Sequence, residues 1–599
     1  MKIEDYAVIG DMHTVALVGI NGSIDWLCLP TFGSDACFAA LLGIENNGFW
    51  QISPREKNFQ VKRAYRDRTL ILETEYTTST GTVRVIDFMP LNSRDREVIR
   101  VVEGVAGEVA MEMQLRIRFD YGKTIPWVRH LEGGGMIAVG GPNAVTLLTP
   151  VPIRGEDMST RADFTAKAGE RKSFILGWHP SHLEPGPRTA TVDEALSRTF
   201  DHWTFWASRC AYRGPWREAV IRSLITLKAL TYAPTGGIMA AATTSLPEFI
   251  GGVRNWDYRY CWLRDATFTL YSFMTAGYFE EARAWSEWLL RAVAGDPSQL
   301  QIMYGAAGER SLPEIELRHL IGYENSRPVR IGNAASEQFQ LDVYGEVMDA
   351  MHLARKSGIK TDDQSWRLQR HLVTFVIDHW QDPDEGIWEI RGPRRHFTHS
   401  KVMAWVAVDR AVKAVEQFGL EGDLPTWTSV RTLIYDDICR KGFNSERNAF
   451  TQYYGAAELD ASLLMMPLVG FMAATDPRMV STVELIEQEL VQGGLVQRYQ
   501  TDSARHIDGL PPGEGTFLPC SFWLADCLYL MGRLNDARSL FERLLSVRND
   551  LGLLAEEYDP AARRQLGNYP QAFSHVCLVN TAYNLNPQTV GPAETRSVV

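Results

Sequence analysis

The stretch Met111-Glu-Met-Gln-Leu-Arg-Ile-Arg-Phe119 alternates apolar and polar residues with a period of two. This period is typical of a strand with one buried face and one polar face. The same alternation runs through residues 69–76 and 82–88, and turn signals such as Asn21-Gly22 separate such segments. We therefore expect residues 1–200 to form a large antiparallel β-sandwich domain that ends in a linker.

Near Val192 the apolar period becomes that of α-helices and remains so. After Pro215 about twelve helical segments follow, bounded by glycine or proline and joined alternately by short and long connections. This alternation predicts a closed double ring of six inner and six outer helices, an (α/α)6 toroid, over residues 201–590. The fold class is then α+β multidomain, with residues 591–599 as a flexible tail. The long connections would gather at one mouth of the ring, and they are residues 301–336, 382–399, 492–515 and 550–572.

Charge and composition exclude several partners. The formal net charge is −12 and no Lys/Arg cluster occurs, which argues against a nucleic-acid partner. The start lacks the apolar core of a secretory signal and no run of about 18 apolar residues is present, so we expect a cytoplasmic protein without a membrane partner. The eight cysteines lie in apolar segments without CxxC spacing, which predicts buried free thiols.

Two distant segments that look like loops, Gly386-Ile-Trp-Glu389 and Leu553-Leu-Ala-Glu-Glu-Tyr558, each carry glutamate close to an aromatic residue. Paired carboxylates perform glycoside hydrolysis, in which one protonates the leaving oxygen and the other activates water or attacks the sugar. The alternative is that each glutamate pairs with a neighbouring arginine, because most acidic side chains are solvated. These arginines are Arg391 and Arg394 for the first segment, and Arg563 and Arg564 for the second.

A third segment, Arg254-Asn-Trp-Asp-Tyr-Arg-Tyr-Cys-Trp-Leu-Arg-Asp265, precedes a predicted helix and has a sugar-binding composition. Aromatic rings offer apolar faces to a sugar, and the Arg-Asp pair supplies donors and acceptors for hydroxyl groups. The alternative is a tryptophan-rich helix start, at which Asp265 caps the helix and Arg264 pairs locally.

These residues resemble a known family, glycoside hydrolase family 15, which contains glucoamylases, glucodextranases and prokaryotic trehalases. The resemblance covers nearly the whole chain, and the opening residues 3–19 and 22–30 look like the prokaryotic trehalase branch. Each motif is short, but together and in this order on the predicted mouth loops they are specific. The motifs are Trp262-Leu-Arg-Asp265, Gly386-Ile-Trp-Glu389, Gly513-Glu-Gly-Thr-Phe517 and Ala555-Glu-Glu-Tyr558.

The resemblance implies an inverting hydrolase with Glu389 as general acid and Glu556 as general base. It places Tyr258 near the nucleophilic water, and Arg264 with Asp265 around the terminal glucose. Two positions depart from fungal relatives: Phe573 stands in place of tryptophan, and Ile390 in place of an acidic residue, so contacts beyond the cleaved bond should differ. The other implied substrate contacts are Arg498 in the same subsite and aromatic walls from Trp262, Trp388 and Phe573.

Several neighbouring residues leave alternatives open. Glu557 competes with Glu556 for the role of base, because adjacent side chains point in different directions. Glu514 lies on a mouth loop, where it either binds substrate or is structural. His396 and His399 are three residues apart, but without a third ligand they do not indicate a metal. We expect neither metal nor cofactor, although some trehalases of the family depend on phosphate or magnesium.

The chemistry also predicts how the two carboxyls differ. A carboxyl beside Trp388 in a partly dry pocket should have a raised pKa and stay protonated, whereas Glu556, nearer arginines and solvent, should remain ionised. An inverting pair should be separated by about 6.5 to 9.5 Å, which leaves room for a water.

The expected substrate is a small α-glucoside, and α,α-trehalose is the first choice because neither a secretory signal nor a starch-binding module is recognisable. Glucoamylase-like hydrolysis of malto- or isomalto-oligosaccharides is the close alternative. A non-catalytic carbohydrate-binding protein and an inverting phosphorylase are further alternatives. Both glutamates argue against a mere binder, and a functional Glu556 argues against phosphorolysis, in which phosphate replaces the base.

Overall fold

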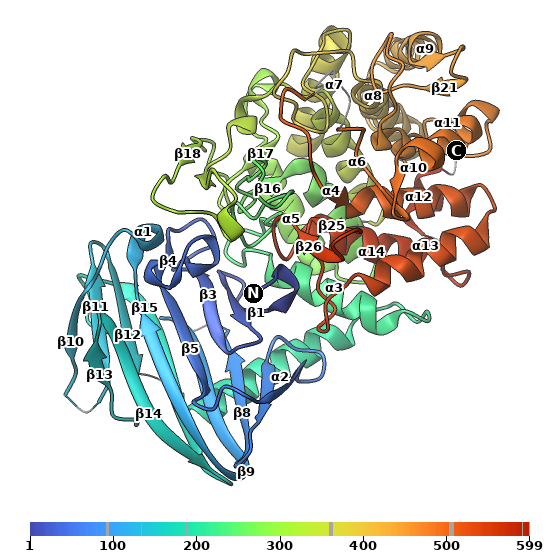
Figure 1. Cartoon of the computed structure of the whole chain (residues 1–599). Coiled ribbons are helices and arrows are strands. Elements are labelled where there is room, and N and C mark those ends of the chain that lie inside the picture. The colour runs from blue at the N-terminus through green and yellow to red at the C-terminus, as the bar shows by residue number, and fades with distance from the viewer. Residues whose placement is uncertain are drawn as a thin grey trace.

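The computed structural model describes residues 1–91, 95–132, 134–186, 188, 190–358, 363–501, 508–589 and 591–597. Figure 1 shows an antiparallel β domain, formed by the first part of the chain, packed against a larger helical domain. This arrangement confirms the expected α+β organisation. Residues 502–507 of one predicted mouth loop lie outside the described residues.

The β domain is a 15-stranded antiparallel sheet folded into two layers. Both layers share β9 (Arg96–Arg116), whose first half pairs with β8 (Gly81–Phe88) and β15 (Arg171–Pro180). Its second half pairs with β5 (Phe49–Pro54) and β14 (Ser159–Lys167). The strands predicted at residues 69–76, 82–88 and 111–119 correspond to β7, β8 and the end of β9. The other strands are β1 (Tyr6–Gly10), β2 (Val15–Gly19), β3 (Ser23–Cys28), β4 (Ala36–Phe38), β6 (Gln60–Tyr65), β7 (Leu72–Thr77), β10 (Trp127–His130), β11 (Met136–Gly140), β12 (Asn143–Leu148) and β13 (Arg154–Glu156).

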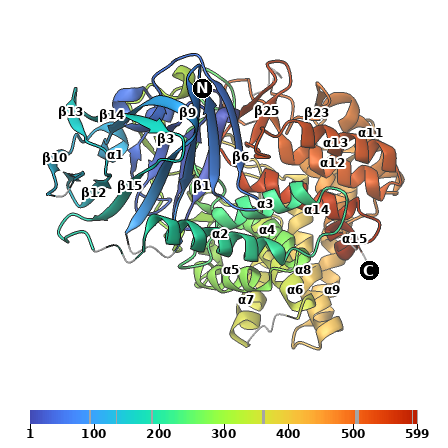
Figure 2. The ribbon, with the colours of Figure 1, turned by 90° about the horizontal axis from the view of Figure 1, so that it is seen from below.

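Helix α2 (Val192–Ser208) joins the two domains and runs through the boundary expected at residue 200 (Figure 2). It begins at Thr191, whose hydroxyl accepts from the N–H of Glu194 while the Glu194 carboxylate caps Thr191 in return. Early in the helix, Leu196 packs with apolar residues of the sheet. Near its end, Trp206 stacks on Tyr278 of the helical domain with ring centroids 4.1 Å apart. The helix therefore belongs to both domains, because it buries one end in each.

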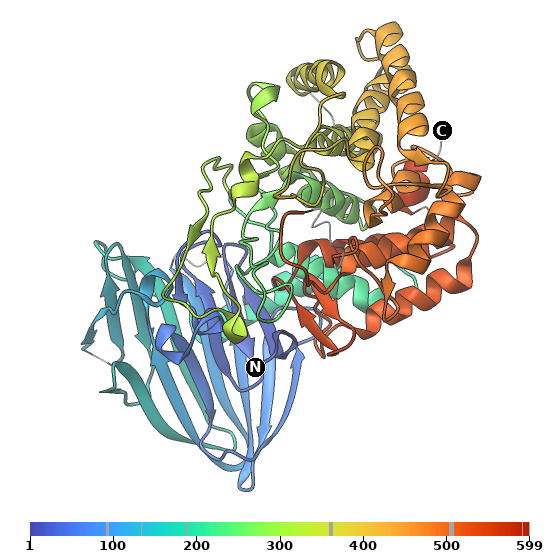
Figure 3. The same ribbon diagram turned by 45° about the horizontal axis from the view of Figure 1, so that its top comes forward.

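The helical domain is the predicted double ring, and Figure 3 shows it from a second direction. Among the described residues, each of six inner helices contacts the next, and the last contacts the first, which closes the ring. The inner helices are α4 (Leu263–Thr275), α6 (Asp342–Lys356), α8 (Thr398–Phe418), α10 (Met465–Leu468), α12 (Leu518–Leu530) and α14 (Ala572–Asn584). The outer helices are α3 (Arg217–Ala229), α5 (Phe279–Ala292), α7 (Asp363–His379), α9 (Leu424–Lys441), α11 (Pro477–Glu489) and α13 (Leu534–Ser546).

Burial explains why these segments form two rings. Every residue of α14 is buried, as befits a helix surrounded on all sides. The outer helix α13 instead buries Ala537, Phe541 and Leu544, which share one face at positions i, i+4 and i+7. One inner element is short: Ala461–Leu464 is a 3-10 turn, and the single turn α10 follows it.

The end of the chain corrects one expectation. Within the expected flexible tail, residues 592–597 form the helix α15 (Pro592–Ser597). Arg596 is buried, lies 3.1 Å from Asp349 of the inner helix α6 and packs over the ring of Tyr271. A buried ion pair fixes this segment to the ring, whereas residues 598 and 599 lie outside the described part.

Short strand pairs brace the long loops of the helical domain. They are β16 (Cys261–Trp262) with β17 (Met303–Tyr304), β18 (Ile315–Glu316) with β19 (Arg330–Ile331), β20 (Phe443–Asn444) with β21 (Ala449–Phe450), β22 (Val491–Gln492) with β23 (Leu495–Val496), and β24 (Thr516–Phe517) with β25 (Glu557–Asp559) and β26 (Arg564–Leu566). All eight cysteines are free thiols, as expected. None of the helices in the described ranges is both long and apolar enough to cross a bilayer.

Candidate active site

Glu389 sits on a tight turn that only a few residue types tolerate. Gly386 has a φ of 70°, and a Cβ there would lie 2.7 Å from the Phe397 ring. Glu389 itself has a φ of 57°, a conformation that costs energy in a non-glycine residue and is frequent at functional sites. The turn aims the carboxyl at Trp262, whose indole Nε1–H donates to Glu389 Oε1 at 2.7 Å. Burial raises the pKa of Glu389, and the nearby Arg264 opposes this rise.

Glu556 lies deeper and is held by a backbone donor. It is fully buried, and its Oε2 accepts the N–H of Asn568 at 3.0 Å. Gly567 must be glycine here, because its φ is 72° and a Cβ would lie 2.5 Å from that carboxylate. Burial, followed by the charge of Glu248, raises the pKa of Glu556 to about 8, while Arg498 opposes the rise. The expectation that Glu556 lies near solvent and stays readily ionised is therefore wrong.

The neighbouring arginines do not neutralise either glutamate by direct pairing. Arg391 lies 3.1 Å from Glu314, and Arg394 lies 2.9 Å from Glu385. Arg564 forms its ion pair with Glu324 at 2.7 Å. These arginines thus bind other carboxylates of the mouth loops, and the surface-pair alternative fails for them.

Arg498 is the centre of a buried cluster of three carboxylates. Its Nη2 donates to Glu248 Oε2 at 2.6 Å and to Glu514 Oε2 at 3.0 Å, and lies 3.4 Å from Glu557 Oε1. The other oxygen of Glu557 accepts the N–H of Gly515 at 2.8 Å. Glu557 is thereby committed to Arg498 and to the loop backbone, whereas Glu556 faces Asn568. The contacts support Glu556 over Glu557 as the base.

The same cluster bears on the question of a metal. In the described part of the chain, Glu248, Glu514 and Glu557 are the group whose oxygens lie close enough together, within 4.8 Å, to hold an ion. The guanidinium of Arg498 already binds all three, and Arg254 lies 3.5 Å from Glu514. Two positive charges, those of Arg498 and Arg254, already lie among these three carboxylates, and this argues against a cation there.

Arg264 and Asp265 begin the inner helix α4 at the side of Glu389. Arg264 Nε donates to Asp265 Oδ1 at 2.7 Å, and its Nη1 donates to the carbonyl of Ile387 at 2.9 Å. Its guanidinium lies 5.3 Å from the centre of the Phe573 ring. Phe573 is fully buried and supports Arg264 from behind, so its contact with a sugar stays a prediction.

The tryptophan that contacts the predicted acid, Glu389, is not the one that was expected. Trp388 points its indole N–H at Asp460 Oδ2, 2.6 Å away, and Trp262 is the tryptophan that contacts Glu389. Tyr258 lies near both glutamates, since their charges raise the pKa of its hydroxyl after burial does. A cavity opens beside these groups and is lined by Glu248, Arg254, Trp256, Tyr258, Arg264, Ile387, Trp388, Glu389, Ile390, Arg391, Arg498, Tyr499, Asp508, Leu510 and Phe517.

The cavity brings together four of the predicted substrate residues with the predicted acid. Tyr258, Arg264, Trp388 and Arg498 line it beside Glu389. The remaining predicted residues are buried and are not among those that line the cavity: Glu556, Trp262, Asp265, Glu514 and Phe573.

Sequence reasoning missed Glu248, Tyr499 and Asp508. Tyr499 donates to Asp508 Oδ2 at 2.7 Å, and Arg254 donates to the same oxygen. The only signals for them were positional: Tyr499 follows Arg498, and Glu248 ends the Ser245-Leu-Pro-Glu248 stretch before the aromatic segment. Glu248 pairs with Arg498, 250 residues away in the sequence, and no periodic pattern predicts such a contact.

Comparison with known proteins agrees with the fold and the motifs. The sequence pattern of glycosyl hydrolases family 15 matches residues 214–583, and that of a trehalase-like N-terminal domain matches residues 1–170. The chain is 39% identical to a trehalase of Mycobacterium tuberculosis, over 97% of this chain and 89% of that protein. It is 35% identical to a trehalase of Thermoplasma volcanium, over 98% of this chain and 93% of the relative.

Among solved structures, a bacterial glucoamylase complexed with acarbose superposes with a TM-score of 0.73 over 100% of this chain and 96% of that chain. At 13% sequence identity this likeness shows the shared fold. The chain belongs to glycosyl hydrolase family 15, and it is a glycoside hydrolase that acts on α-glucosidic bonds.

Proposed function

We propose that this enzyme is a trehalase that hydrolyses α,α-trehalose with inversion at the attacked carbon. Relatives named trehalase match almost the whole chain, including the N-terminal β domain. The substrate proposal rests on this full-length similarity, since the catalytic machinery alone is shared with glucoamylases.

The observation that carries the mechanism is the way the two carboxyls are held. Glu389 receives the Trp262 indole N–H and Glu556 receives the Asn568 backbone N–H, and the arginines paired nearby bind other acids. Glu389 lines the cavity and Glu556 is fully buried, and Tyr258, which also lines the cavity, lies near both of them. These contacts support the assignment of Glu389 as the acid and Glu556 as the base, one of each being required for inverting hydrolysis.

In the proposed reaction, Glu389 gives its proton to the glycosidic oxygen as the bond to that oxygen breaks. Glu556 takes a proton from a water that attacks the anomeric carbon on the opposite face. Burial disfavours the charged form of Glu389 and raises its pKa, which is the direction that an acid catalyst needs. Arg264 and Asp265, joined to each other and to the turn at Ile387, would hold the terminal glucose hydroxyls.

The test is NMR of the first products, read before mutarotation equilibrates them. Inverting hydrolysis of trehalose should release one β-glucose and one α-glucose, whereas retention would give two α-glucose molecules. Phosphorolysis in added phosphate would instead give β-glucose 1-phosphate and glucose. Trehalose left intact would refute the proposed substrate.

Glucoamylase-like action is the second candidate, because the family that the sequence resembles contains glucoamylases as well as trehalases. Maltose and isomaltose in the same assay separate the two, because a trehalase should leave both nearly untouched. The cytoplasmic location expected from the sequence stays a prediction.

A further inference from the structure

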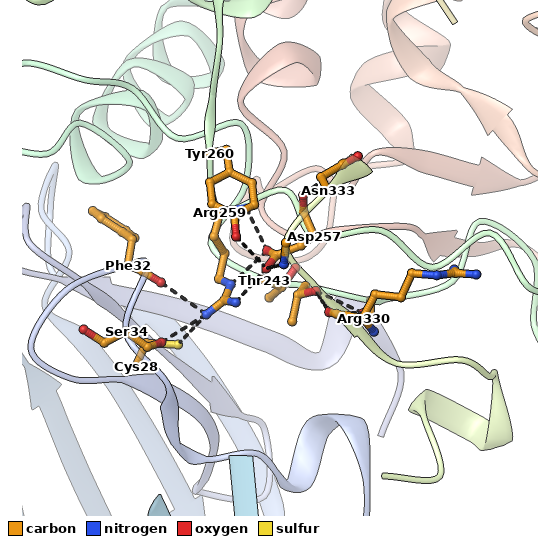
Figure 4. Close-up of polar contacts among 12 residues, drawn as sticks. Cys28, Phe32, Ser34, Thr243, Asp257, Arg259, Tyr260, Arg330 and Asn333 are labelled. Carbon is orange, nitrogen blue, oxygen red and sulfur yellow. Dashed lines mark hydrogen bonds and ion pairs between the residues drawn. The ribbon is translucent and has the colours of Figure 1, made fainter. Parts of the chain in front are cut away.

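The segment of residues 256–262 is shared between the cavity and the domain interface. Trp256 and Tyr258 line the cavity, and Trp262 contacts Glu389. The intervening Asp257 and Arg259 point the other way, and Figure 4 shows Arg259 reaching from the catalytic segment to residues of the N-terminal domain. Alternation over residues 256–259 therefore gives Trp256 and Tyr258 to the cavity and turns the Asp257–Arg259 pair away from it.

Arg259 is the residue that crosses between the domains. It is 2% exposed, and its Nη1 donates to the carbonyl of Ser34 at 3.1 Å, to that of Phe32 at 3.4 Å and to Cys28 Sγ at 3.5 Å. The guanidinium also lies 5.8 Å from the Trp26 ring centre and 5.4 Å from that of Tyr121. All five partners belong to the β domain.

Asp257 ties Arg259 back to the catalytic segment. Its carboxylate is fully buried and accepts from Arg259 Nε at 2.9 Å and from Arg259 Nη2 at 2.7 Å. This bidentate contact fixes the plane of the guanidinium. The same carboxylate accepts the N–H of Gly332 at 3.2 Å and the hydroxyl of Tyr260 at 3.4 Å. Rotating or shifting Tyr258 thus requires breaking contacts on both sides of it in sequence.

A second path leads from the β domain to the base. Trp26 donates its indole N–H to the carbonyl of Ala242 at 2.9 Å. The next residue, Thr243, donates to the side chain of Asn568 at 2.9 Å. Asn568 donates its backbone N–H to Glu556. Trp26, which packs against Arg259, therefore also supports the loop that holds the proposed base.

We propose that Arg259 is a positioning residue through which the β domain holds Tyr258 and Trp262 against the two catalytic glutamates. In this proposal the β domain helps to position residues of the active site. This inference rests on the roles of Glu389 and Glu556 proposed above. It is separable from them, because its experiment measures only how turnover responds to changes at Arg259.

The experiment compares Arg259→Met and Arg259→Lys with a matched control, Arg100→Met. Arg100 is also fully buried, bound to one aspartate, Asp87, to two backbone carbonyls and over Trp50, but it lies within the β domain alone. Both arginine-to-methionine changes should lower Tm. For the folded enzyme, Arg259→Met should reduce kcat about 10- to 100-fold, since misplacing catalytic groups by about 1 Å has effects of that size. KM should change less than about threefold, because Arg264 and Arg498 hold the sugar from other elements.

Arg259→Lys keeps the positive charge but cannot make the bidentate contact with Asp257, so its kcat should lie between those of the wild type and Arg259→Met. If Arg259→Met does not fold, Trp26→Phe gives the milder test, since it removes one indole donor and keeps the ring. A double-mutant cycle of Arg259→Lys with Tyr258→Phe should be non-additive in kcat if Arg259 acts through Tyr258.

Three results would overturn the proposal. The first is a folded Arg259→Met enzyme with wild-type kcat, which would reduce Arg259 to a stabilising contact like Arg100. The second is strict additivity in the cycle with Tyr258→Phe. The third is an equal loss of kcat in Arg100→Met. Failure of the catalytic assignment would appear elsewhere, as activity retained in Glu389→Gln or Glu556→Gln.

Discussion

The loop around Glu389 and the loop around Glu556 both bury a carboxyl, yet they satisfy it with different donors. Glu389 accepts from a side chain, the Trp262 indole, and has Arg264 nearby. Glu556 accepts from backbone and lies close to another carboxylate, Glu248, which helps raise its pKa to about 8. Burial raises the pKa of both carboxyls, so the two sites differ in their donors and in their neighbouring charges. Proximity to arginine in the sequence therefore says little about the charge state of a glutamate in the folded site.

The strongest way to break this comparison is to remove each carboxyl in turn. Glu389→Gln should lower kcat on trehalose by about 10²- to 10⁴-fold, the usual worth of general acid catalysis. It should lose far less on α-glucosyl fluoride, whose leaving group needs little protonation. Glu556→Gln should lose on both substrates, because each requires an activated water.

The neighbouring Glu557→Gln is the matched control for Glu556→Gln. It disturbs Arg498 and Gly515, so it should lower stability and reduce turnover less than Glu556→Gln does. Full activity in Glu556→Gln together with loss in Glu557→Gln would reverse the assignment. Equal losses of Glu389→Gln on the two substrates would remove it from the role of acid.

Removing the partner of Arg264 tests the acid side with the next largest effect. Asp265→Ala should reduce kcat/KM by about 10²- to 10³-fold, because hydroxyl contacts that strengthen at the transition state are worth several kcal/mol. Arg264 would also lose the acceptor that orients its guanidinium. Unchanged kcat/KM in a folded Asp265→Ala protein would show that the pair supports the helix start and no more.

The pH dependence of kcat/KM tests the assignment of Glu556 as the base. Glu556 must be ionised to act, so kcat/KM should rise with pH through its pKa, which lies near 8. Glu248→Gln removes the neighbouring negative charge and frees Arg498 to act more strongly, and both changes should move this rising limb to lower pH. Glu514→Gln removes a different partner of Arg498 and should move the limb less. A limb near 4.5 in the wild type would contradict the raised pKa.

The smallest expected effect is on stability. A carboxyl whose folded pKa is raised stabilises the fold fully below its unfolded pKa, about 4.5, and this contribution is lost as pH rises through about 8. Glu556→Gln cannot ionise, so it should gain stability over the wild type between pH 5 and pH 8, by roughly 3 to 4 kcal/mol at about 1.36 kcal/mol per pKa unit. Thermal unfolding at the two pH values measures this gain. A constant Tm difference across the range would show that Glu556 is not buried as a costly charge.

Much of the fold could be predicted because its signals are local. The alternation at Met111–Phe119 and the helical periods after Pro215 depend only on which faces are buried, and both appear in the structure. The boundary was less predictable, because α2 carries a helical pattern while packing on both domains. The tail was missed for a similar reason: Arg596 looks like a solvated charge until Asp349 is known to face it.

The candidate site divides in the same way. Order and motif selected Glu389 and Glu556 as candidates, since their segments stand out in loops. They did not reveal that Trp262, and not Trp388, donates to the acid, or that Arg498 holds Glu248, Glu514 and Glu557 together. These contacts join residues far apart in the chain, and no spacing rule encodes them.

By itself, the sequence determined the two kinds of secondary structure, the closed ring that alternating connections require, and the two segments that carry the candidate glutamates. Only the tertiary structure decided which donors hold those glutamates, how far each pKa is raised, and that Arg259 turns away from the cavity to bind the β domain. The physical reason is range. Periodicity and turn chemistry act over a few residues, whereas burial and charge pairing depend on segments that meet only when the two domains have packed.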